Sequence, residues 1–188
     1  MADESNDWAS VGSVTDTMAV DVEALSGDLV GAHRIGCGRI DALYRVTVDQ
    51  ASDVTIVSSG GSPKDINFIQ GHKSIHHAAA FVKDGGKLII LCQCVDGIGS
   101  NYFMKFLESG NFDKAFDMLE KNYEGNGGTA LSMITKTSRI DIYMHTNLTD
   151  QDCIALNVTK LTEQEIQQFI NSEKGSIVVI QNASVLVK

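Results

Sequence analysis

Residues 54–73 have the sequence VTIVSSGGSPKDINFIQGHK, and this stretch decides the fold. The apolar run Val54–Val57 is typical of a buried strand. Two glycines and Pro63 follow it and predict a tight turn. Residues 74–82 then have the pattern of a helix. A strand, a glycine turn and a helix in this order are typical of one unit of an open α/β sheet, in which ligands gather at the carboxyl ends of parallel strands.

The rest of the chain repeats this alternation of strands and helices. The predicted strands are 54–57, 88–92, 140–144 and 177–180, and the predicted later helices are 102–108, 112–123, 129–138, 150–155 and 163–171. Because βαβ connections are almost always right-handed, we expect a three-layer α/β sandwich with a mainly parallel, Rossmann-like sheet. The loops 60–73 and 94–101 should then lie at the same edge of that sheet.

The N-terminal part gives weaker signals. Residues 1–16 are small and polar, which predicts a frayed or disordered extension, and residues 17–25 alternate as a half-buried strand would. Asp28 is expected to cap a helix that runs to Tyr44. The residues expected to be buried on that helix are Leu29, Ala32, His33, Ile40 and Leu43. The helix over 74–82 is expected to end at Asp84-Gly85-Gly86, where glycine suits a left-handed cap.

Composition excludes several classes of protein. The 188 residues carry a formal net charge of -9 and no basic stripe, so a nucleic-acid partner is not expected. No apolar run approaches the roughly 20 residues of a membrane span. The acidic first residues do not resemble a signal peptide. The four cysteines of this chain are too few for a disulfide framework, and free thiols predict a cytoplasmic protein.

The motifs for common cofactors are missing or weak. The glycine loops match neither G-x-G-x-x-G nor a P-loop, so on motif grounds they are turns. His72 and His76 have the i, i+4 spacing of metal ligands, and Cys92-x-Cys94 lies at a strand end with both thiols on one face. Neither pattern completes a known metal motif, and no metal is expected in this chain. Gln70 and Lys73, three residues apart, would share one helix face and could hold an anion.

Three strings together resemble a known family. They are Gly60-Gly61-x-Pro63-x-Asp65-x-Asn67-x-x-Gln70-x-x-Lys73, then Val82-Lys83-Asp84-Gly85-Gly86-x-Leu88-Ile89-Ile90, and Cys94-x-Asp96-Gly97-Ile98-Gly99. The chain resembles the C-terminal domain of the nickel-pincer lactate racemase family, and the resemblance assigns residues 17–188 to that α/β domain. Gln93 stands where relatives often have glutamate, and His72, His76 and His77 correspond to no family role.

The resemblance implies a function for the whole parent protein. Family members racemise or epimerise lactate or another 2-hydroxy acid by hydride transfer through a nickel pincer nucleotide. The cofactor is anchored in an N-terminal domain, which would be the partner of this chain, and no cofactor is expected in this chain alone, which should be inactive by itself. Gln70 and Lys73 would be the catalytic residues contributed to the interdomain cleft. The residues of the substrate- and cofactor-facing loops would be Gly60, Gly61, Pro63, Asp65 and Asn67. The alternative is a stand-alone, non-catalytic domain that binds a small anion or a partner at the same edge.

Overall fold

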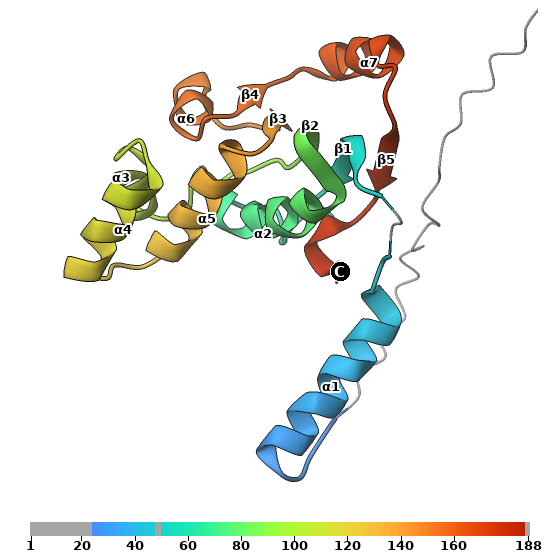
Figure 1. The fold of residues 1–188 in the computed structure, drawn as a ribbon, viewed down its shortest axis with the longest axis vertical. Coiled ribbons are helices and arrows are strands. Elements are labelled where there is room, and N and C mark those ends of the chain that lie inside the picture. Colours follow the sequence, from blue (N-terminus) through green and yellow to red (C-terminus); the bar gives the residue numbers. More distant parts are fainter. Residues whose placement is uncertain (1–23, 48–49, 187–188) are drawn as a thin grey trace, which may run out of the picture.

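The computed structural model describes residues 24–47 and 50–186 and contains one five-stranded sheet (Figure 1). All neighbouring strands are parallel, in the order β4-β3-β2-β1-β5. The strands are β1 (Ser52–Ser58), β2 (Val82–Leu91), β3 (Asp141–His145), β4 (Thr159–Lys160) and β5 (Ile177–Ile180). The four predicted strands and the parallel α/β class are therefore confirmed. The sequence analysis missed β4, because two residues carry no periodicity.

The helices also follow the predicted order, with one addition at the C-terminal end. They are α1 (Leu29–Tyr44), α2 (Phe68–Ala78), α3 (Phe103–Leu107), α4 (Phe112–Lys121), α5 (Gly127–Thr137), α6 (Asp150–Ala155) and α7 (Glu163–Ser172), with short 3-10 helices η1 (Ala79–Phe81) and η2 (Ala183–Val185). Both α6 and α7 begin with a capping box, in which Thr149 and Thr162 exchange hydrogen bonds with the third helical residue. Sequence reasoning therefore placed these two helices well.

The two faces of the sheet are covered unequally. On one face, α2, α3, α4, α5 and η2 enclose the main core, which includes Phe68 and Phe103. On the other face, Ile166 of α7 packs with Val54 and Ile89 in a much smaller core. Side chains of β2 alternate between the two, since Leu88 and Ile90 belong to the main core and Ile89 to the smaller one. The three layers are confirmed, and most of the apolar burial lies on the α2 side.

The expected limits of the second helix were wrong. The helix starts at Phe68, where the Asn67 side chain accepts a hydrogen bond from the backbone of Gln70, and it ends at Ala78. The segment 84–86 lies inside β2 instead of capping a helix. Gly85 does have a positive φ of 73°, but it lies in a bulge. There the pairing of β1 with β2 changes from Ser52↔Val82 to Val54↔Lys87.

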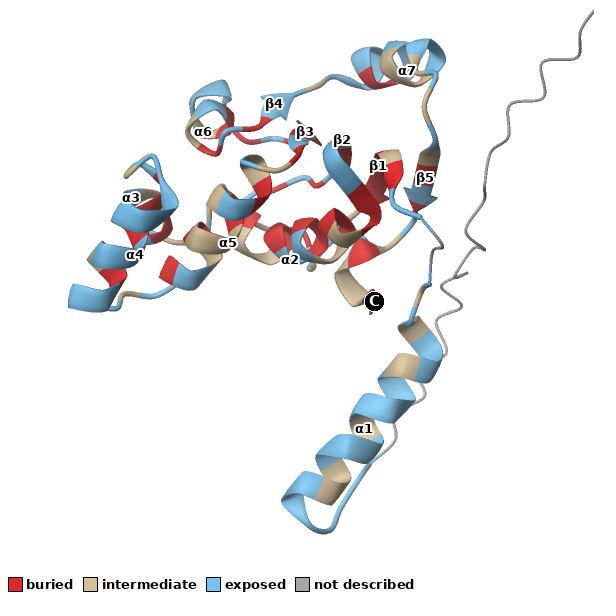
Figure 2. Ribbon diagram, viewed as in Figure 1, coloured by how far each residue is buried: buried red, intermediate tan, exposed pale blue. Residues whose placement is uncertain are grey.

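The expected burial along α1 was also wrong. Asp28 caps this helix as predicted, accepting a hydrogen bond from Gly31 N at 2.8 Å. However, α1 has no buried residue, and Leu29 and Leu43 are 84% and 65% exposed. Figure 2 shows α1 extending away from the sheet, so no other described element covers its apolar side chains. The expected extension 1–16 and most of the expected strand 17–25 lie outside the described residues, and Ala24 and Leu25 are not in a strand.

No helix in the described part of the chain combines the length and the apolar character needed to cross a bilayer.

Candidate functional site

The loop after β1 turns sharply at the carboxyl edge of the sheet. Ser59 is buried and its N–H continues the sheet by donating to Leu91 O at 3.1 Å. Gly60 and Gly61 then take positive φ values of 84° and 73°, which side chains other than glycine rarely adopt. A Cβ on Gly60 would lie 2.6 Å from the side-chain oxygen of Asn182, which follows β5. Glycine is therefore required here both by conformation and by the close approach of Asn182.

Asp65 ties this loop to the end of the neighbouring strand. Its side chain is only 4% exposed, and its Oδ2 accepts a hydrogen bond from Gln93 N at 3.1 Å. Its own carbonyl oxygen accepts one from Cys94 N at 2.8 Å. The carbonyl of Ile66 accepts another from Asp96 N at 2.8 Å. The loops that follow β1 and β2 are therefore joined by three hydrogen bonds to backbone N–H groups.

The same two loops also meet at the start of α2. Phe68 N donates to Gly97 O at 2.9 Å, and Ile69 N donates to Ile98 O at 3.1 Å. Carbonyls from the second loop thus satisfy N–H groups of the first helical turn, which have no partner inside the helix. Gly99 lies against Asn67, because a Cβ there would be 2.3 Å from Asn67 Cγ. The prediction that loops 60–73 and 94–101 share one edge is confirmed.

Gln70 and Lys73 lie together on the first two turns of α2. Lys73 Nζ donates a hydrogen bond to Gln70 Oε1 at 2.6 Å. Lys73 is exposed and Gln70 is half-buried. Because the glutamine oxygen already accepts from the ammonium, the amide N–H groups and the remaining ammonium protons are all donors. No ion pair between Lys73 and a carboxylate occurs among the described residues. This pair can bind a carboxylate or phosphate oxygen.

The other residues predicted for this edge divide into two groups. Gly60, Gly61 and Pro63 form the accessible turn, since Gly60 and Pro63 are exposed and Gly61 is half-buried. Asp65 and Asn67 instead point their side chains at backbone N–H groups of the protein itself. Their geometry supports the position of α2.

Gly71 is a residue of this edge that sequence reasoning did not single out. A Cβ on Gly71 would lie only 2.2 Å from Cys92 Sγ. The helix can therefore approach the end of β2 only because this position lacks a side chain. A glycine inside a helical pattern is the available sequence signal for such a contact.

The cysteines and histidines near the edge form no metal centre among the described residues. Cys92 Sγ and Cys94 Sγ are 3.4 Å apart and both are buried. The hydrogen bond with Cys94 lowers the pKa of Cys92, whereas the same bond and burial raise the pKa of Cys94. Burial, and then the charge of Lys136, lower the pKa of His72 to about 3. Cys94 and His72 are therefore neutral at pH 7, and all three side chains are buried in the interior.

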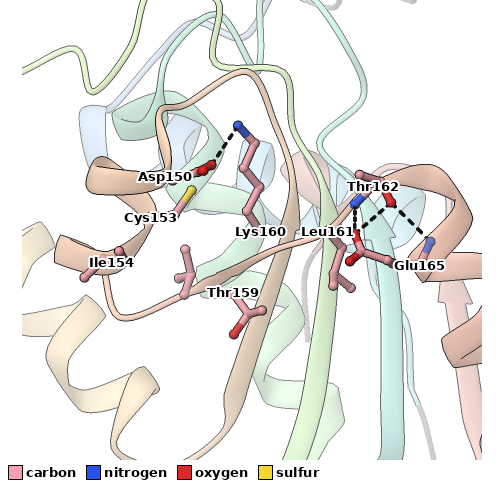
Figure 3. Close-up of a pocket in the computed structure, with 9 residues that line it drawn as sticks. Asp150, Cys153, Ile154, Thr159, Lys160, Leu161, Thr162 and Glu165 are labelled. Carbon is pink, nitrogen blue, oxygen red and sulfur yellow. Dashed lines mark hydrogen bonds and ion pairs between the residues drawn. The ribbon is translucent and has the colours of Figure 1, made fainter.

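An open pocket of about 460 Å³ lies at another point of the molecule, between α6 and α7 (Figure 3). The connections that leave β3 and β4 diverge here toward opposite faces of the sheet, which is where open α/β sheets often bind ligands. Its polar groups already have partners: Lys160 donates to Leu148 O at 2.6 Å and pairs with Asp150 at 3.4 Å. The Thr162 hydroxyl donates to Glu165 at 2.7 Å. The Gln70–Lys73 pair, with unused donors, is the stronger candidate.

The fold and this edge define the class of protein: a parallel α/β domain with a pair of unused side-chain donors at the edge after its first two strands. Residues 47–127 match the family model described as the lactate racemase C-terminal domain. The family resemblance inferred from the three sequence strings is thereby confirmed for this part of the chain, which contains every residue of the candidate site.

Curated relatives agree with the family match. The lactate racemase of Thermoanaerobacterium thermosaccharolyticum is 36% identical over 87 residues, which cover 46% of this chain and 20% of the relative. The lactate racemase of Lactiplantibacillus plantarum is 32% identical over 95 residues, covering 50% of this chain and 22% of the relative. The matched segments thus span about a fifth of the length of these relatives.

Solved structures support the fold over a longer part of the chain. The lactate racemase apoprotein from T. thermosaccharolyticum superposes with a TM-score of 0.71 at 23% identity, covering 83% of this chain and 40% of that one. A protein from Thermotoga maritima superposes with a TM-score of 0.54 at 14% identity, covering 79% and 40%. At these identities the likeness concerns the fold alone.

Proposed function

We propose that this chain forms the C-terminal domain of a racemase or epimerase that acts on lactate or another 2-hydroxy acid. The observation that carries the proposal is the Gln70–Lys73 pair, which lies inside the family match and presents unused donors at the carboxyl edge of the sheet. In the parent, this edge would face a cleft against an N-terminal domain. The free cysteines of the described residues support a cytoplasmic location.

The chemistry of the pair suits the substrate class. Lys73 provides a full positive charge that attracts a carboxylate, and the Gln70 amide adds a directional hydrogen bond. Two fixed donors hold the carboxylate of a 2-hydroxy acid in one orientation, which leaves C2 and its hydroxyl directed away from α2. This domain would therefore position the substrate while groups of the other domain exchange the proton and the hydride.

The nickel pincer nucleotide implied by the family fits this edge only through its anionic groups, since the donor set offers an ammonium and an amide but no metal-ligating cluster among the described residues. When bound, that cofactor supplies the acceptor for the hydride that leaves C2. Gln70 and Lys73 are the residues of this chain that would contact its charged part or the substrate beside it.

The test is Lys73→Ala in the full-length, cofactor-loaded parent, with interconversion of D- and L-lactate and of other 2-hydroxy acids followed by chiral chromatography. Loss of one charge-assisted hydrogen bond of about 1.5–3 kcal/mol should lower kcat/KM roughly 10- to 150-fold. Lys114→Ala, an exposed lysine on α4, is the matched control and should leave kcat/KM unchanged.

Equal kcat/KM for Lys73→Ala and the control would contradict the role given to this edge. Circular dichroism and Tm check that both variants remain folded, so that a lower kcat/KM can be assigned to the active site instead of to unfolding. A parent that racemises no 2-hydroxy acid but binds small carboxylates through Lys73 would favour the non-catalytic alternative.

A further inference from the structure

A second group of basic side chains lies where α2 packs against α5. We define the α2–α5 basic cluster as His72, His76 and Lys136, together with the Ser132 hydroxyl. Lys136 is 9% exposed and His72 is 6% exposed. His76 is exposed and Ser132 is half-buried, so the cluster can be reached from solvent.

The buried ammonium of Lys136 has only neutral partners. Its Nζ donates to Ser132 O at 3.2 Å and also to Ser132 Oγ. No carboxylate forms an ion pair with it in the described part of the chain. Burial and then Arg139 lower the pKa of Lys136 to about 8, so it is still mostly charged at pH 7. A buried charge without a counter-ion is unfavourable, and here it occurs in a chain of net charge -9.

The neighbouring groups add further donors. Because an ammonium only donates, Ser132 Oγ accepts from Lys136, and the same oxygen lies 3.5 Å from His76 Nδ1. His72 Nε2 is buried and has no hydrogen-bond partner among the described residues. The two imidazole rings have centroids 6.4 Å apart. The cluster therefore combines an ammonium with two imidazole rings, and no carboxylate pairs with Lys136 among the described residues.

We propose that the α2–α5 basic cluster binds a small oxyanion of the phosphate class. The anion would supply the counter-ion that Lys136 lacks and would accept hydrogen bonds from Lys136 Nζ and the His76 ring. It differs from the Gln70–Lys73 pair in burial, because Lys136 and His72 are buried whereas Lys73 is exposed.

Inorganic phosphate is the probe, added at constant ionic strength with sodium chloride as the balancing salt. Binding is measured by the concentration dependence of Tm and by the imidazole NMR signals of His72 and His76. We expect a saturable rise in Tm and shifts of both histidine signals. Lys136→Met removes the ammonium, keeps similar volume, and should weaken phosphate binding about tenfold or more.

Three further variants locate the anion. His76→Asn changes an exposed position and should also weaken phosphate binding. It replaces Lys136→Met in the test if that variant does not fold. Lys114→Met controls for the loss of any surface lysine and should bind like the unmodified chain. Lys73→Ala tests whether phosphate binds at the Gln70–Lys73 pair instead. The proposal is overturned if phosphate gives no saturable effect, if Lys136→Met and His76→Asn bind as tightly as the unmodified chain, or if Lys73→Ala alone abolishes binding.

Discussion

Substituting Gly71 by alanine tests whether the contact between α2 and the end of β2 is as close as the structure shows. In the interior of an exposed helix, glycine to alanine stabilises by about 1 kcal/mol. At Gly71 the new Cβ would lie 2.2 Å from Cys92 Sγ. Cys92 is buried and its sulfur already contacts Cys94 Sγ at 3.4 Å, so it has little room to move away.

Overpacking of this kind costs about 1–3 kcal/mol. Because the added Cβ would lie only 2.2 Å from Cys92 Sγ, the cost of the clash should exceed the gain in helix propensity. Gly71→Ala should therefore lower the free energy of unfolding by about 1–2 kcal/mol. Cys92→Ala removes the clashing sulfur. In that background, Gly71→Ala should instead stabilise by up to about 1 kcal/mol, so the coupling between the two sites is about 2–3 kcal/mol.

Urea unfolding followed by circular dichroism measures all four members of this double-mutant cycle. The reasoning is refuted if Gly71→Ala alone stabilises the protein, or if the sign of its effect is the same with and without the Cys92 sulfur. Gly128→Ala on α5, where no atom lies within 4 Å of the added Cβ, is the control for helix propensity and should not destabilise.

Three other outcomes are expected. Gly99→Ala should destabilise by about 1–3 kcal/mol in urea unfolding, because φ is +82° and the Cβ would meet Asn67; an effect no larger than that of Gly128→Ala would count against the loop geometry. Asp65→Ala should cost about 1–3 kcal/mol in the same assay by leaving the Gln93 N–H without its acceptor, whereas wild-type stability would show that this bond contributes nothing. The pKa of His72 is about 3 folded and 6.5 unfolded, so the unfolded chain binds more protons in this window, and stability should fall as pH falls from about 6.5 toward 3. His72→Phe should flatten that pH profile in phosphate-free buffer, and an unchanged slope would assign it to other groups.

The strands could be predicted because their apolar runs are continuous. Val54–Val57 and Leu88–Ile90 are covered on both faces, so nearly every residue in them is apolar and the pattern can be recognised without any knowledge of partners. β4 has two exposed residues and is a strand only because β3 lies beside it. A strand of that kind is defined by its neighbour and carries no signal of its own.

The errors at α1 and α2 have different physical causes. On α1, apolar spacing predicted a buried face, but periodicity shows which side chains lie on one face and not whether another element covers it. On α2, Asn67 is a good N-cap, yet its effect depends on Phe68 and Ile69 donating to carbonyls of a loop about thirty residues away. The prediction of a C-cap at Gly85 was wrong because the positive φ of this residue belongs to a bulge in β2 and not to a helix end.

The placement of the candidate site was predictable from topology, whereas the buried contacts that hold its loops in place were not. Parallel strands bring their carboxyl ends to one edge, so the loops after β1 and β2 had to be neighbours. Nothing in the sequence indicated that Asp65 would be buried and would accept a backbone hydrogen bond from Gln93. A carboxylate in a polar loop ordinarily faces water.

The fixed position of α2 helps explain how two long side chains at its surface can act as a site. Gln70 and Lys73 are long and rotate freely in solution, so ordering them against a ligand costs entropy. The backbone that carries them is fixed by the Asp65 contacts, by the Asn67 cap, and by the glycine at 71 that lets α2 rest on Cys92. The hydrogen bond between the two side chains restricts them further. A carboxylate bound here therefore has to order little beyond itself, which is the condition under which two donors can orient a small substrate.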